Sequence, residues 1–275
     1  MAIFSCRFNV LSRANGDNAI QYATYCSGEK LFDERAGRTC KRPKENNVIA
    51  SEILRPEGSA EWLQDRARLW NTVEQSEKRK DAQLMRECRV SLPIELSWQD
   101  NQALVRDFVR REFVSKGMVA DIGYHDNPGN PHAHILLTMR QATKDGFAKR
   151  KSREWNDEQQ LVVWRKAWAH AANKALEAAG SDKRIDHRTL KAQRAEALAR
   201  GDMALATELD REPTVPRNVG QHMKQVWGWP ALQLEQYENI LKRNETRRKL
   251  QENADLNEQI ALQNSVTAHQ RGKSV

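Results

Sequence analysis

The chain has 275 residues and a formal net charge of +8 at pH 7. Its length suits one large domain, or one domain with an appendage, that buries a sizeable core. No apolar run approaches the length of a membrane span and no secretory signal opens the chain, so we expect neither membrane insertion nor secretion. The excess of positive charge favours an anionic partner such as nucleic acid.

The cysteines indicate the compartment. Their positions are Cys6, Cys26, Cys40 and Cys88. This spacing fits neither a metal site nor a disulfide framework, so we expect reduced thiols and a cytoplasmic protein.

The first predicted element is a strand over residues 2–10, because apolar and polar side chains alternate there. A turn and a helix over residues 17–28 follow, with Asp17 or Asn18 as the cap. Tyr22 and Tyr25 lie three residues apart and so share one face of this helix. By themselves, two such aromatic residues more often pack than react.

The middle of the chain alternates in the same way. Residues 29–57 are polar, basic and rich in turn formers, and we expect a loop with short ordered pieces. Helices are predicted over 59–80 and 98–116. Between them, residues 87–93 form a predicted strand that places Glu87 and Arg89 on its polar face.

A predicted β-hairpin then carries three of the seven histidines. Its strands cover residues 118–125 and 132–139, joined by a turn that contains two prolines and a glycine. His132 and His134 share one face of the second strand, opposite an apolar face. His125 precedes the turn, where the hairpin brings it beside the other two histidines.

Three converging imidazoles predict a divalent-metal site. Neutral imidazole is the commonest nitrogen ligand for metals in proteins. A site with three protein ligands keeps positions open for water or substrate, which catalytic centres need. A single histidine would more often be structural, but this spacing favours metal at His125, His132 and His134.

The remaining predicted elements are helices and a basic segment in the C-terminal half of the chain. A basic run around residues 144–153 precedes a helix over 157–179, and a polar or amphipathic helix is expected over 231–263. We therefore predict an α+β fold with a central antiparallel sheet flanked by helices. The expected domains are residues 1–220 and a helical C-terminal extension over 221–275.

The histidine motif resembles that of the HUH endonucleases, and the neighbouring sequence resembles the MobA/MobL family of plasmid mobilisation relaxases. The resemblance covers roughly residues 1 to 220. It implies an HUH relaxase-like topology. It also implies an N-terminal tyrosine, an acidic residue on the middle strand and the three-histidine motif, in that order.

The resemblance assigns roles to particular residues. Tyr25 corresponds to the nucleophile, with Tyr22 in reserve, and Cys26 stands where the family typically has an arginine. Glu87 corresponds to the acidic residue, either as proton acceptor or as the group that fixes the tautomer of a histidine. His125, His132 and His134 would hold Mn²⁺ or Mg²⁺, and we expect Mn²⁺ to bind readily because Mg²⁺ prefers oxygen ligands.

The implied function is strand-specific nicking and rejoining of plasmid DNA at a transfer origin through a 5′-phosphotyrosine, which initiates conjugative mobilisation. The expected partner is single-stranded DNA, with accessory mobilisation proteins and a coupling protein as further partners. The candidate DNA-binding residues are Arg7, Arg13, Arg89, Lys149, Arg150, Lys151, Arg153 and His187. Two alternatives stay open: a rolling-circle replication initiator with the same chemistry, and a non-catalytic DNA-binding protein with a structural metal.

Overall fold

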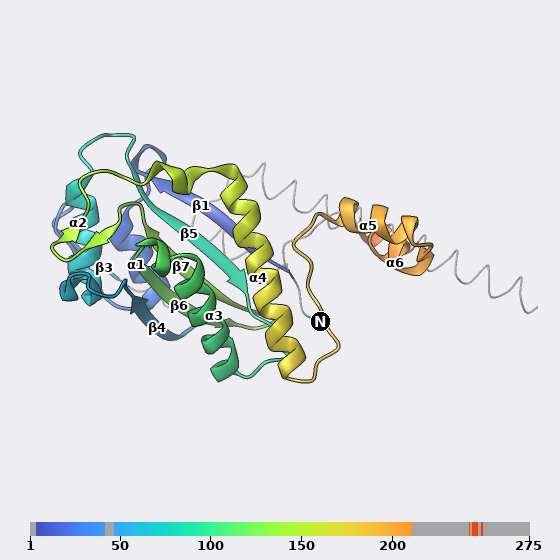
Figure 1. Cartoon of the computed structure of the whole chain (residues 1–275). Helices are drawn as coiled ribbons and strands as arrows, with labels where there is room; N and C mark the ends of the chain where they lie inside the picture. The colour runs from blue at the N-terminus through green and yellow to red at the C-terminus, as the bar shows by residue number, and fades with distance from the viewer. Residues whose placement is uncertain (1–3, 42–46, 211–241, 243, 247–248, 250–275) are drawn as a thin grey trace, which may run out of the picture. The chain divides into compact units, whose positions relative to one another are not determined.

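The computed structural model describes residues 4–41, 47–210, 242, 244–246 and 249 (Figure 1). The chain divides into two compact units, Met1–His187 and Arg188–Val275. The domain boundary expected after residue 220 lies outside the described residues. Among those that are described, no helix combines the length and the apolar composition that crossing a membrane requires.

A five-stranded sheet forms the centre of the first unit, and every neighbouring pair of strands is antiparallel. Its spatial order is β1 (Cys6–Ser12), β5 (Gln83–Ser91), β7 (Asn130–Thr138), β6 (Ala120–Asn127) and β4 (Val48–Leu54). The helices are α1 (Ala19–Ser27), α2 (Arg66–Ser76), α3 (Trp98–Glu112) and α4 (Glu158–Ala178). This architecture confirms the predicted α+β class.

The main core lies between one face of the sheet and the helices α3 and α4 (Figure 1). Phe108 of α3 and Trp168 of α4 meet edge to face, with ring centroids 5.2 Å apart. Residues at alternate positions of the strands, such as Ile122 and Tyr124 of β6, pack beneath them. The opposite face of every strand is therefore directed away from this core.

Helices α1 and α2 cover that opposite face near β6. Asp121 of β6 is buried and accepts hydrogen bonds from Arg66 and from the indole of Trp70, both on α2. A buried ion pair of this kind fixes α2 on the strand, since removing either partner would leave an unpaired charge.

The structure departs from the sequence-based prediction in the segment 29–57, which was expected to be a loop. The segment contains the short hairpin β2 (Leu31–Asp33) and β3 (Arg38–Cys40), and it also contains β4, an edge strand of the main sheet. Strand β4 has no deeply buried face, so its sequence lacks the strong alternation that marks an inner strand.

Short elements account for the smaller differences. The predicted helix over 59–80 is divided into a 3₁₀ turn and α2, and a two-stranded ribbon of β8 (Ala142–Thr143) and β9 (Gly146–Phe147) follows the hairpin. The 3₁₀ turns are η1 (Arg13–Asn15), η2 (Glu61–Gln64), η3 (Val114–Lys116) and η4 (Arg153–Asn156).

In the second unit, two short helices pack together. They are α5 (Leu190–Ala199) and α6 (Met203–Glu208), joined around Ala197, Ala206 and Leu209. The helix predicted over 231–263 lies almost wholly outside the described residues, of which 242, 244–246 and 249 are helical.

Candidate metal centre and nucleophile

The three histidines of the predicted motif converge on one face of the sheet. His125 of β6 lies directly opposite His132 of β7, and His134 follows two residues later on the same side of β7. All three side chains are buried, and one candidate ligand nitrogen from each lies within 4.8 Å of the others. The arrangement can hold a metal ion, as the spacing in the sequence predicts.

Hydrogen bonds set the tautomers of two of these rings. The Nδ1 of His132 lies 2.7 Å from the carbonyl of Asn130, and the Nδ1 of His134 lies 2.6 Å from the carboxylate of Glu87. Because carbonyl and carboxylate oxygens only accept, each Nδ1 carries the hydrogen and each neutral ring keeps its lone pair on Nε2.

The two Nε2 atoms are 3.1 Å apart. Two facing lone pairs at this distance repel unless a proton or a cation lies near both. Burial, together with the neighbouring His134 and His125, lowers the pKa of His132 well below its usual value, so a proton is disfavoured there. The donor set of this site therefore fits a divalent metal.

Glu87 of β5 supports the triad from the next strand. One carboxylate oxygen contacts His134, and the other accepts a 3.2 Å hydrogen bond from Asn9 of β1. Burial by itself raises the pKa of Glu87, but the interactions of Glu87 with His134, Arg89 and Asn9 together outweigh burial and lower the pKa to about 2. With both oxygens engaged, the geometry favours the tautomer-fixing role over that of proton acceptor.

Tyr25 of α1 packs directly against the triad. Its ring centroid lies 5.4 Å from the rings of both His125 and His134. Burial raises the pKa of Tyr25, while the charge of Arg89 lowers it. The hydroxyl of Tyr22 instead lies 3.5 Å from the carboxylate of Asp17.

The C-terminal end of α1 contacts β6 closely. The Cys26 carbonyl lies 3.1 Å from Nε2 of His125 and accepts its hydrogen, so the lone pair of that ring belongs to Nδ1. A Cβ added to Gly123 would lie only 1.9 Å from the same carbonyl oxygen. Position 123 therefore needs glycine for the helix to reach this place.

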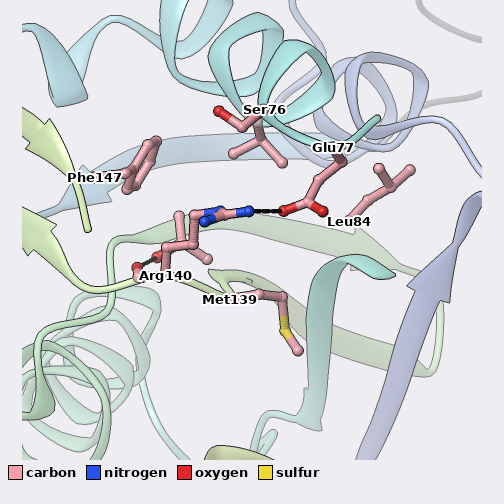
Figure 2. Close-up of a pocket in the computed structure, with 8 residues that line it drawn as sticks. Ser76, Glu77, Leu84, Met139, Arg140 and Phe147 are labelled. Atoms are coloured by element: carbon pink, nitrogen blue, oxygen red, sulfur yellow. Dashed lines mark hydrogen bonds and ion pairs between the residues drawn. The ribbon is translucent and has the colours of Figure 1, made fainter. Parts of the chain in front are cut away.

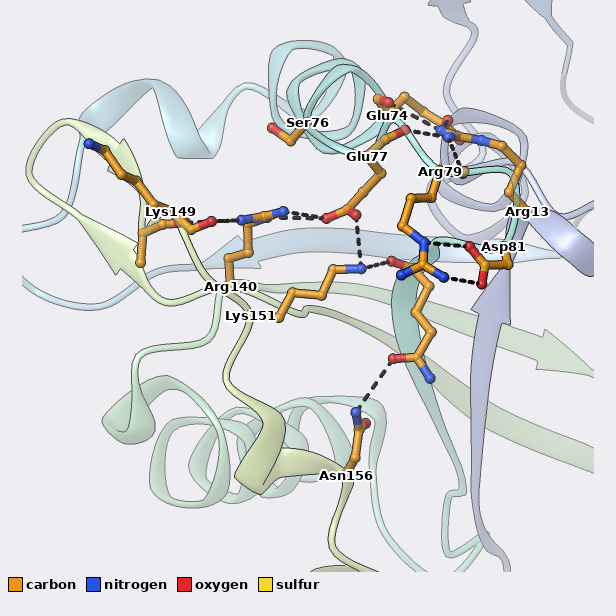
Figure 3. A network of polar contacts seen from close by, with 12 residues as sticks. Arg13, Glu74, Ser76, Glu77, Arg79, Asp81, Arg140, Lys149, Lys151 and Asn156 are labelled. Carbon is orange, nitrogen blue, oxygen red and sulfur yellow. Dashed lines mark hydrogen bonds and ion pairs between the residues drawn. The ribbon is translucent and has the colours of Figure 1, made fainter.

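The N-terminal end of α1 is fixed as well. Asn18 caps the helix by accepting a hydrogen bond from the amide of Gln21, as one of the two predicted caps would. The amide of Ala19 donates to Glu74 of α2 at 2.8 Å. Arg13 also pairs with Glu74, so this DNA-binding candidate takes part in holding α1 (Figure 3).

The other basic candidates differ in their surroundings. Lys151 pairs with Glu77 at 2.9 Å, whereas the Lys149 ammonium points away from this network (Figure 3). Arg150 and Arg153 are exposed. His187 lies at the end of the first unit, with its Nδ1 3.7 Å from Asp186, and its backbone carbonyl accepts a hydrogen bond from Arg165. Arg7 and Arg89 lie on the sheet face that carries the histidines.

A small hollow lies elsewhere, at the end of β7 that is far from the histidines. The ion pair between Glu77 and Arg140 lies within it, with Phe147 and Met139 among the residues that line it (Figure 2). It contains none of the residues of the triad, so the site lies on the sheet beneath α1 and not in this hollow.

Asn9, Gly123 and the Cys26 carbonyl are parts of the site that the sequence analysis did not single out. Asn9 occupies a polar position of the alternating first strand, and a glycine inside a strand can mark a close approach of another backbone. The backbone carbonyl of Cys26 leaves no signal in the sequence.

The fold and the site together define an α+β protein in which a tyrosine on a helix packs against a buried cluster of three histidines. The model of the MobA/MobL family matches residues 17–208. The chain belongs to this family, as the sequence resemblance predicted.

Three similar proteins illustrate the relationship. The conjugal transfer protein TraA of Agrobacterium fabrum is 33% identical over 80% of this chain, and the mobilization protein MobL of Acidithiobacillus ferridurans is 32% identical over 69%. The chain spans 22% of the length of the first and 58% of the second. A solved structure described as the molecular basis of vancomycin resistance transfer in Staphylococcus aureus is 29% identical, with a TM-score of 0.61 over 68% of this chain and 99% of that one.

Proposed function

We propose that this chain is the nicking domain of a conjugative relaxase. It binds single-stranded plasmid DNA at a transfer origin, cuts one strand at a specific phosphodiester and later rejoins it. Accessory mobilisation proteins and a coupling protein are the further partners, and the cytoplasm is the compartment. Support comes from the family and from relatives that are named as conjugal transfer and mobilization proteins.

The observation that carries this proposal is the packing of Tyr25 against the triad. A tyrosine whose ring lies 5.4 Å from two potential metal ligands is placed to attack a phosphate held at the same centre. Tyr22, whose hydroxyl is directed at Asp17, is the reserve candidate.

The proposed cofactor is Mn²⁺ or Mg²⁺, held by His125, His132 and His134. When bound, such a cation neutralises charge on the phosphate under attack. Three nitrogen ligands suit Mn²⁺ better than Mg²⁺, which prefers oxygen. Glu87 keeps His134 in the tautomer that offers Nε2, and Asn9 keeps Glu87 in place.

The reaction is a transesterification at phosphorus. The Tyr25 oxygen forms the new bond to phosphorus and gives up its proton, and the bond from phosphorus to the 3′ oxygen breaks as that oxygen takes up a proton. The products are a 5′-phosphotyrosine and a free 3′-hydroxyl. Because one phosphodiester replaces another, the hydroxyl can attack the phosphotyrosine in return, and this attack reseals the strand.

The test is a mixture of the protein, Mn²⁺ and an oligonucleotide that carries a transfer origin, resolved on a denaturing gel. The proposal predicts a metal-dependent, protease-sensitive shifted band that persists in Tyr22→Phe and is lost in Tyr25→Phe. A band lost only in Tyr22→Phe would move the nucleophile to Tyr22. Binding without any adduct on the cognate origin would favour a non-catalytic DNA-binding protein.

A further inference from the structure

A row of side chains crosses the sheet beside the candidate metal centre. Arg7 of β1 lies opposite Arg89 of β5, and Arg89 lies opposite His134 of β7. Residues directly opposite in an antiparallel sheet have Cβ atoms about 5 Å apart on the same face. The two arginines therefore extend the histidine site toward β1, an edge of the sheet (Figure 1).

Their position on the site face follows from their neighbours along the strands. Asn9 and Glu87 lie two residues from Arg7 and Arg89 respectively, and both belong to the hydrogen-bonded cluster around His134. Since strand side chains alternate with a period of two, each arginine projects on the same side as its neighbour.

The pairing of two like charges is unfavourable by itself. Partial burial lowers the pKa of Arg7, and the charges of Arg89 and Arg165 lower it further. Within the described part of the chain, neither Arg7 nor Arg89 lies within ion-pair distance of a carboxylate. An anion between the two guanidinium groups would remove this repulsion.

Other basic residues are used differently. Arg13 and Lys151 are paired with Glu74 and Glu77 and stabilise the fold. The basic segment from Lys149 follows the end of β7 that is remote from the histidines. Arg7 and Arg89, by contrast, continue the row of side chains that contains His134.

We propose that Arg7 and Arg89 form a phosphate-binding pair that holds a DNA phosphate adjacent to the one that Tyr25 attacks. This inference rests on the proposed function. The bound strand then leaves the metal centre across β5 and β1, in the direction away from β4. Guanidinium groups suit this task because they bind phosphate oxygens through two parallel hydrogen bonds.

The pair also explains how the site tolerates Cys26. The Cys26 side chain is buried, and its backbone carbonyl contacts His125, so this residue offers no charge to DNA. Arg89 of β5 places a positive charge near Tyr25 of α1. Arg7 and Arg89 hold the DNA strand in position, and Tyr25 forms the new bond to phosphorus.

The experiment measures how affinity for a single-stranded oligonucleotide depends on salt. All proteins carry Tyr25→Phe, so that no cleavage intervenes. Each phosphate contact to a single strand contributes about 0.7 to the slope of log affinity against log salt. We expect Arg7→Gln and Arg89→Gln each to make the slope shallower by about 0.7, and the double variant by about 1.4.

The matched control is Arg110→Gln, since Arg110 is an exposed arginine of α3, on the opposite side of the sheet. It removes the same charge and should leave the slope unchanged. If the double variant and the control both keep the slope of the parent protein, the proposed phosphate-binding pair is wrong. It is also wrong if the slope decreases equally in both, because that decrease would reflect net charge alone.

A second readout locates the phosphate. In the Tyr25→Phe background, one neutral methylphosphonate is moved along the oligonucleotide. We expect one position next to the scissile phosphate to weaken binding, and the double variant to lose that effect. If the methylphosphonate weakens binding equally at every position, both in the Tyr25→Phe protein and in the double variant, Arg7 and Arg89 do not bind a particular phosphate. Both experiments measure DNA binding and need no cleavage. Their results can therefore be interpreted even if the protein fails to nick DNA.

Discussion

At the scale of single residues, the orientation of the imidazoles decides what the site can bind. His132 and His134 each donate through Nδ1, to Asn130 and Glu87 respectively, and each keeps a lone pair on Nε2. Groups that hold a ligating histidine in this way orient the ring and raise its basicity. We therefore expect Glu87 to affect metal affinity without contacting the metal.

The first prediction concerns Glu87→Gln. The neutral amide of glutamine can still accept a hydrogen bond from Nδ1 of His134. It lacks the negative charge that raises the basicity of the imidazole and so favours metal binding through Nε2. We expect Mn²⁺ affinity to fall about 10- to 100-fold, with the fold retained. Isothermal titration with Mn²⁺ measures this change. The control is Glu57→Gln, an exposed glutamate, which should bind as the wild type does. Equal affinity in Glu87→Gln and wild type would contradict the role.

Most residues of the candidate site were predicted from the sequence. The three histidines, Glu87 and Tyr25 were predicted from strand alternation and from the family resemblance, and the structure brings all five together. The contacts of Asn9 were not predicted, because pairing between β1 and β5 spans 78 residues of sequence. Such contacts depend on the strand order, which local patterns do not encode.

At the scale of elements, α1 carries the proposed nucleophile, Tyr25, and contacts the proposed metal ligands. Glu74 holds its first turn, and the last turn contacts β6 at Gly123 and His125. Tyr25 lies between these two anchors. A shift of either end would move the tyrosine relative to the triad, and small misplacements of reacting groups have large effects on rate.

The second prediction concerns Gly123→Ala. The new methyl group would overlap the Cys26 carbonyl, so the last turn of α1 must move away from β6. We expect the free energy of unfolding to fall by about 1–3 kcal/mol, typical of overpacking, and the rate of adduct formation to fall more steeply than stability explains. Urea denaturation and single-turnover adduct kinetics measure the two effects.

The control for this prediction is Gly37→Ala. Gly37 has a φ of 64°, and an added Cβ would meet nothing within 4 Å. Its cost is backbone strain alone, about 1–2 kcal/mol, without movement of α1. If Gly123→Ala and Gly37→Ala form adduct equally fast, the close approach at Gly123 has no functional role.

Elements differed in how well the sequence predicted them. Inner strands and long helices have strong periodicity, and β6, β7, α3 and α4 were placed close to their observed bounds, whereas β5 begins at Gln83, earlier than the predicted 87–93. The edge strand β4 was not, since it has neighbours on one side only and carries Ala50, Ser51 and Glu52 at its centre. Its partner is β6, about 70 residues away in sequence, as in the pairing of Glu52 with Ile122.

At the scale of the whole molecule, all the site residues lie in one compact unit. The triad, Glu87 and Tyr25 fall within Met1–His187, and the unit from Arg188 contributes none of them. The family match extends to residue 208, into α6. We therefore expect metal binding to be independent of the second unit.

The third prediction follows from this division. A chain that ends after His187 should fold cooperatively and bind Mn²⁺ with the dissociation constant of the full chain, since it keeps every proposed ligand. Thermal unfolding and Mn²⁺ titration of the two chains provide the comparison. Loss of Mn²⁺ binding by a cooperatively folded short chain would show that residues after 187 complete the centre.

The most direct test of the central claim is to identify the residue that becomes covalently bound to DNA. The wild-type adduct is formed with Mn²⁺, digested with trypsin and nuclease, and sequenced by mass spectrometry. Cleavage after Arg13 and Lys30 yields one peptide that contains both Tyr22 and Tyr25. The account predicts a nucleotide phosphate on Tyr25. A phosphate on Tyr22, or on a residue outside this peptide, would contradict it.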